Sequence, residues 1–116
     1  QSALFRVEPV AHTPEQITFK LYGSLFFGAV SKMDGLMAAA EGAAPGQAMV
    51  LEASHLISLD TTGLDTLEQL HKLLHKKGCP LGMVGVNEQP RSLMERSGFA
   101  QHLHTFQSPA SGEPGR

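Results

Sequence analysis

The sequence LDTTGLDTLEQL, residues 59–70, lies between two segments of different hydrophobic period. Before it, QAMVLEAS (residues 47–54) is a short, continuous apolar run, which is typical of a central strand buried on both faces. After it, apolar residues recur at helical spacing at Leu64, Leu67, Leu70 and Leu74. The stretch therefore predicts a buried strand that leads directly into an amphipathic helix.

On the amino-terminal side, residues 17–22 alternate between apolar and polar side chains, which predicts a strand with one wet face. Residues 4–10 look like its antiparallel partner, and HTPEQ between them carries turn chemistry. Residues 25–42 change to a helical period, and GAAPG then supplies glycine and proline as stop signals.

On the carboxyl-terminal side, PLGMVGV (residues 80–86) predicts another buried strand. EQPRSLMERSG (residues 88–98) predicts a short helix, and residues 104–106 an edge strand. The fold class is therefore α/β: one domain with a mixed sheet that is mostly parallel, an N-terminal antiparallel hairpin and helices packed against the sheet. We assign residues 1–107 to this domain and expect SPASGEPGR, residues 108–116, to be a disordered tail.

Composition narrows the classes of function. The chain has 116 residues, a net charge of −2 and no run of Lys or Arg, so nucleic-acid binding is not expected. Its single cysteine, Cys79, cannot form an internal disulfide. No apolar run approaches the roughly 20 residues that cross a bilayer, so we expect no membrane insertion of this segment.

The polar residues between the central strand and its helix are the candidate site: Asp60, Thr61, Thr62 and Gly63. Open α/β sheets bind ligands at the carboxyl ends of their strands, and a helix start offers free N–H groups to an anion or a phosphate. Gly63 could let a partner approach closely. The alternative is a plain helix cap, with Asp60 or Thr61 as the N-cap residue.

Catalytic and metal sites find less support. His71 and His75 share a helix face, and a third ligand could come from His55, His102 or His104, but no cysteine pair or HExxH motif accompanies them. No nucleophile elbow or Walker loop occurs. We therefore predict no enzyme activity, no metal and no cofactor, and any nucleotide contact would be unconventional.

Three segments, in this order, resemble the STAS domain, the module shared by sulfate transporters and anti-sigma factor antagonists. They are YGSLFFGAVSKM (residues 22–33), LDTTGLDTLEQL (residues 59–70) and LGMVGVNEQPRSLMERSGF (residues 81–99). The resemblance implies a mixed sheet with helices packed against it. The LFFGA segment is most similar to the C-terminal cytoplasmic domain of SulP-type anion transporters.

That branch implies a non-catalytic regulatory domain at the cytoplasmic face of the inner membrane. Its partners would be the transmembrane domain of its own transporter and a cytoplasmic regulatory protein. The alternative is a free-standing anti-sigma factor antagonist, in which the hydroxyl residue after the aspartate, Thr61 here, is phosphorylated by a kinase. Phe26 and Phe27 either pack at the strand–helix junction or form an exposed partner contact.

Overall fold

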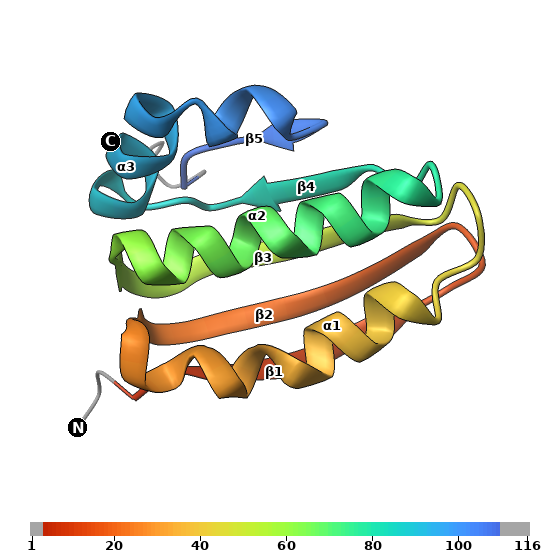
Figure 1. The fold of residues 1–116 in the computed structure, drawn as a ribbon, viewed down its shortest axis with the longest axis horizontal. Coiled ribbons are helices and arrows are strands. Elements are labelled where there is room, and N and C mark those ends of the chain that lie inside the picture. The colour runs from red at the N-terminus through yellow and green to blue at the C-terminus, as the bar shows by residue number, and fades with distance from the viewer. Residues whose placement is uncertain (1–3, 110–116) are drawn as a thin grey trace.

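The computed structural model describes residues 4–109, and the part of the predicted tail from residue 110 onward lies outside them. Five strands form one sheet in chain order: β1 (Arg6–His12), β2 (Gln16–Leu25), β3 (Ala48–Leu59), β4 (Leu81–Val84) and β5 (Thr105–Phe106). The pair β1–β2 is antiparallel and the other pairs are parallel. The predicted α/β fold with its N-terminal hairpin is confirmed (Figure 1).

The helices connect these strands. The crossover from β2 to β3 contains a 3₁₀ helix, η1 (Phe27–Met33), and α1 (Asp34–Glu41), and α2 (Thr61–Lys76) joins β3 to β4. Between β4 and β5 lie α3 (Glu88–Ser97) and a second 3₁₀ helix, η2 (Phe99–His102). Figure 1 shows α1 and α2 side by side on the same face of the sheet.

The alternation predicted for residues 17–22 is present in β2. Ile17 and Leu21 are buried, whereas Thr18, Lys20 and Tyr22 on the opposite face are only half-buried. Because side chains of a strand alternate between its faces, the first set packs under the helices and the second set does not. The strand is longer than predicted and ends at Leu25.

The single helix predicted over residues 25–42 is wrong. Leu25 is still part of β2, Phe26 is extended with φ −119° and ψ 174°, and residues 27–33 form the 3₁₀ helix η1 before α1 begins at Asp34. Apolar spacing alone does not distinguish a 3₁₀ from an α-helix, and Gly28 and Gly35 both have low α-helix propensity.

Strand β3 is also longer than predicted, because it continues past the polar pair Ser54 and His55 to Leu59. The register between β2 and β3 shifts at this point: Lys20 pairs with Glu52, but Tyr22 pairs with His55. This bulge leaves Ser54 and His55 exposed without ending the strand, and such irregularities carry no hydrophobic period. The predicted step from strand to helix at Leu59 is confirmed.

Candidate functional site

Asp60 is the N-cap of α2 and is held by contacts to three segments. Its Oδ1 accepts a hydrogen bond from the Gly63 amide at 2.8 Å, and its Oδ2 accepts one from the Phe27 amide at 3.4 Å. Its own amide donates to the Leu25 carbonyl at 3.3 Å. Asp60 is therefore the helix cap that one interpretation predicted, and it also joins the end of β2 and the start of η1 to α2.

Thr61 and Thr62 are the first two residues of α2, and both are exposed. Within residues 4–109, neither amide and neither hydroxyl makes a hydrogen bond. The helix dipole adds positive potential at this end, so two free N–H groups and a hydroxyl lie where an anion is favoured. The expected surface location of Thr61 is thus present, while its phosphorylation stays a prediction.

Gly63 does not offer the open approach that its lack of a side chain suggested. It is buried, and a Cβ atom there would lie 2.3 Å from the Leu25 carbonyl oxygen and 2.9 Å from Leu59 Cδ1. The space that a side chain would need is filled by the end of β2. Gly63 therefore lets α2 pack closely on the sheet, behind the exposed threonines.

Two amide side chains that the sequence analysis missed hold the end of β3. Gln89 Oε1 accepts from the Leu59 amide at 2.8 Å, and its Nε2 donates to the Leu59 carbonyl at 3.0 Å. Asn87 Nδ2 donates to the carbonyls of Ser54 and Leu56 at 2.9 and 3.2 Å. Since β4 pairs with β3 only as far as Glu52, these side chains occupy the place of a neighbouring strand. Contacts across 30 or more residues leave no local sequence signal.

Aromatic surface lies next to Asp60. Phe27 is 78% exposed and Phe26 is 44% exposed, so the expectation that both pack at the strand–helix junction is wrong and the partner-contact alternative fits. Phe26 also lines a shallow hollow of about 400 Å³ together with Leu4 and Lys32. A large exposed aromatic beside a polar loop is the usual composition of a protein contact surface.

The histidines of α2 lie on a different side of the helix. The His71 ring is 5.4 Å from His75, 5.0 Å from His102 and 6.4 Å from Phe99, between ring centroids. Burial lowers the pKa of His71 below its usual value, and the neighbouring His102 and His75 lower it further. Among residues 4–109, no group of three or more His, Cys, Asp or Glu side chains has an arrangement that could hold a metal ion.

None of the helices in residues 4–109 combines the length and the apolar content that crossing a bilayer requires.

Comparison with solved structures identifies relatives of this fold. The anti-sigma factor antagonist SpoIIAA in its unphosphorylated form is 17% identical, with a TM-score of 0.71 over 85% of this chain and 86% of that chain. An anti-sigma factor antagonist from Mycobacterium paratuberculosis is also 17% identical, with a TM-score of 0.71 over 86% and 85% of the two chains. The Bacillus cell fate determinant SpoIIAA in its phosphorylated form is 16% identical, with a TM-score of 0.63 over 95% and 99%. At this identity the likeness shows a shared fold.

No curated protein sequence matches the chain. The profile of the family described as "STAS domain" matches residues 8–112. Neither this match nor the three structural relatives connects the chain to SulP-type transporters. The comparisons therefore do not support the similarity to these transporters that the LFFGA segment indicated. The match extends over most of the chain and agrees with the observed sheet order, and the chain therefore belongs to the STAS domain family.

Proposed function

We propose that this chain is a non-catalytic regulatory STAS module of the anti-sigma factor antagonist type, switched by phosphorylation of Thr61. The observation that carries the proposal is the placement of Thr61: the residue is exposed at the first position of α2, directly after the capping Asp60, and its hydroxyl makes no hydrogen bond within residues 4–109. This is the position that the STAS resemblance assigns to the phospho-acceptor.

The fold comparisons support this choice over the transporter assignment. The three structural relatives named above are anti-sigma factor antagonists, and SpoIIAA has been solved in both unphosphorylated and phosphorylated forms. In our proposal the partner is a protein kinase that contacts the 60–63 segment and the exposed Phe27 beside it. No cofactor bound to this chain is needed, because the kinase would supply the nucleotide.

A phosphate on Thr61 would change the character of this surface. It adds a charge of about −2 at neutral pH. Two free amides and the helix dipole favour that charge, while the Asp60 carboxylate beside it opposes it. A kinase surface that accepts the neutral threonine beside Phe27 would therefore meet a strongly anionic patch after transfer.

The test is phosphorylation of the purified domain by the anti-sigma-type kinases of the source organism, with ATP and intact-mass detection. We expect one added phosphate on the wild type and on Thr62→Ala, and none on Thr61→Ala. Thr62 is the matched control because it is the next residue and is also exposed, in the same helical turn. Unchanged phosphorylation of Thr61→Ala, or no transfer by any of these kinases, would refute the proposal.

A separate measurement addresses the contact surface. Phe27→Ser removes an exposed ring and should weaken kinase binding by about tenfold or more, because buried aromatic anchors commonly dominate interface energies. The melting temperature should stay within a few degrees of the wild type. Equal affinities of the two proteins would exclude Phe27 from the interface.

A second candidate function is that of the cytoplasmic regulatory domain of a SulP-type anion transporter. Exposed Phe27 belongs to the segment that resembles the cytoplasmic domains of SulP-type carriers, and there it would face the carrier's membrane domain. The complete gene separates the two candidates: ten or more apolar membrane segments encoded upstream would establish the carrier, with its localisation at the inner membrane.

A further inference from the structure

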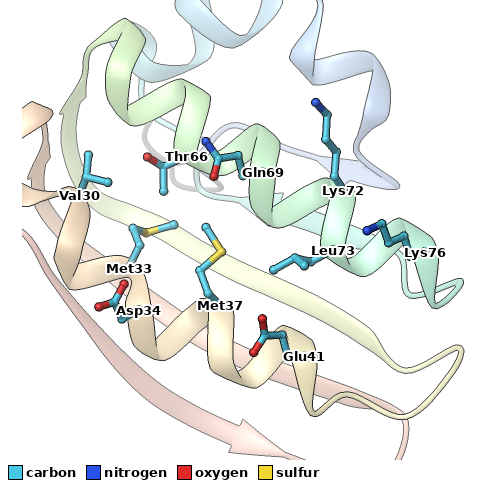
Figure 2. A pocket seen from close by; sticks show the side chains of 10 residues that line it. All are labelled: Val30, Met33, Asp34, Met37, Glu41, Thr66, Gln69, Lys72, Leu73 and Lys76. Atoms are coloured by element: carbon cyan, nitrogen blue, oxygen red, sulfur yellow. The ribbon is translucent and has the colours of Figure 1, made fainter.

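A groove between α1 and α2 forms a second surface, separate from the 60–63 segment. It has a volume of about 490 Å³. Figure 2 shows Met33, the last residue of η1, and Met37 of α1 extending toward α2, and Leu73 of α2 extending toward α1. Met33 is buried, whereas Met37 and Leu73 are half-buried, so the floor of the groove is apolar and partly accessible.

The two sides of this groove carry opposite charges. Asp34 and Glu41 come from α1, whereas Lys72 and Lys76 come from α2 (Figure 2). The ion pairs found among residues 4–109 are Arg6–Glu8 and Arg91–Glu95, so none of the four groove charges is neutralised by a partner in this part of the chain.

One end of the groove is fixed. Lys77, just after α2, donates through Nζ to the carbonyls of Ala40, Glu41 and Ala43 at the end of α1. These bonds hold the carboxyl ends of the two helices together. The groove is therefore a preformed feature of the fold, and its occupant need not first separate α1 from α2.

We propose that this groove binds an amphipathic α-helix of a partner protein, with basic residues on one flank and acidic residues on the other. The helix would lay its apolar stripe on the methionine and leucine floor, its basic flank toward α1 and its acidic flank toward α2. Methionine side chains adapt to different apolar stripes, which suits such a groove. The proposal is independent of phosphorylation at Thr61.

The charges favour this occupant over two others. A fatty acid or another anionic amphiphile could satisfy the lysines of α2 but would meet Asp34 and Glu41 on the opposite side. A second copy of the chain presenting the same face would place two concave surfaces against each other and leave a void between them, which close packing disfavours. A helix is convex and can carry both charges at once.

The size of the groove also fits a helix. Its lining residues run from Val30 to Glu41 on one side and from Thr66 to Lys76 on the other. The eleven α2 residues from Thr66 to Lys76 span about 16 Å, or three turns, at 1.5 Å per residue. A peptide of about fourteen residues would therefore fill the groove with one turn to spare.

The test uses three synthetic fourteen-residue helical peptides that share one leucine stripe. The first has lysines on one flank and glutamates on the other, the second has lysines on both flanks, and the third has glutamates on both. A peptide with its two flanks exchanged would not be a control, because reversing the helix direction restores the match. We expect the first peptide to bind about tenfold more tightly than the others, since exposed pairs each change affinity by a factor of about 1.4 to 5.

Charge reversal in the protein gives the decisive comparison. Lys72→Glu with Lys76→Glu makes both sides acidic, so the all-lysine peptide should become the tightest ligand. Asp34→Lys with Glu41→Lys should favour the all-glutamate peptide. Arg96→Glu on α3, outside the groove, is the matched control and should leave the wild-type order unchanged. Circular dichroism checks that each variant folds.

Amide chemical shifts of the labelled domain locate the peptide. Shifts confined to α1 and α2 together with the expected change of order would support the proposal. It would be overturned by no binding at millimolar peptide, by shifts centred elsewhere, or by the same order in every variant. Tighter binding of dodecanoate than of any peptide, or a dimer that the peptides do not displace, would overturn it in favour of the other occupants.

Discussion

Replacing Gly63 by alanine adds one methyl group at the third residue of α2, where two opposing effects can be compared. In an ordinary helix the change is stabilising by about 1 kcal/mol, because alanine has the higher helix propensity. In this fold the new Cβ would lie 2.3 Å from the Leu25 carbonyl oxygen, 2.9 Å from Leu25 Cγ and 2.9 Å from Leu59 Cδ1. The structure therefore predicts a loss where helix propensity predicts a gain.

The backbone contact decides the magnitude. A flexible side chain could rotate away from the methyl group, but the Leu25 carbonyl is fixed in β2 and also accepts a hydrogen bond from the Asp60 amide. Either the end of β2 or the start of α2 must move. Overpacking of this kind costs about 1–3 kcal/mol, occasionally more, and the backbone contact places Gly63→Ala at the upper end. After the helix-propensity gain of about 1 kcal/mol, a net loss of about 2 kcal/mol remains.

Urea unfolding of Gly63→Ala and Gly35→Ala measures this difference against a matched control. Gly35 is the second residue of α1, and a Cβ there meets nothing within 4 Å. Gly35→Ala should therefore gain about 0.5–1 kcal/mol, which separates the two variants by roughly 3 kcal/mol. A Gly63→Ala protein as stable as the wild type, or more stable, would refute the close packing of α2 on Leu25.

Three further changes test contacts that hold the domain together. Gln89→Ala should lower the free energy of unfolding in urea by about 1–3 kcal/mol, because both hydrogen bonds to the Leu59 backbone are lost; wild-type stability would show that they do not form in solution. Lys77→Met should lower the free energy of unfolding in urea by about 2 kcal/mol, since the carbonyls at the end of α1 lose a charged donor, whereas the exposed Lys76→Met should be neutral in the same urea titrations. Burial lowers the pKa of His71 in the folded protein, so on acidification the unfolded chain takes up the proton first. The contribution of neutral His71 to stability is therefore complete above about pH 6.5 and is lost as the pH falls through the folded pKa. His71→Gln should flatten the dependence of stability on pH below about pH 6.5, and identical slopes for the two proteins would exclude His71 as its source.

The strand–turn–helix unit at Asp60 could be predicted because its determinants are local. A continuous apolar run, a capping residue and a period of 3.6 all lie within about thirty residues, and the structure has them in that order. The Asp60 cap is also local, since its acceptor and the Gly63 donor are three residues apart. Such features depend on the backbone geometry of one segment and so can be recognised in a single sequence.

The features that give the site its shape are not local. Gly63 is needed because Leu25, 38 positions earlier in the chain, occupies the space beside it. Gln89 holds Leu59 from a helix that lies beyond another strand. Phe26 and Phe27 are as hydrophobic as core residues, but β2 ends at Leu25 and both rings are exposed beyond it. Tertiary packing, rather than the local sequence, determines the contacts and the exposure of these residues.

The contacts around Asp60 also indicate where a phosphate on Thr61 would act. The side chains whose hydrogen bonds anchor this corner include Asp60, Gln89 and Asn87, and within residues 4–109 the Thr61 side chain makes no hydrogen bond. Adding a phosphate would therefore break no hydrogen bond within residues 4–109. The change lies in the charge that this surface presents, so the response to phosphorylation would be located in the binding partner's affinity rather than in a conformational change of the domain.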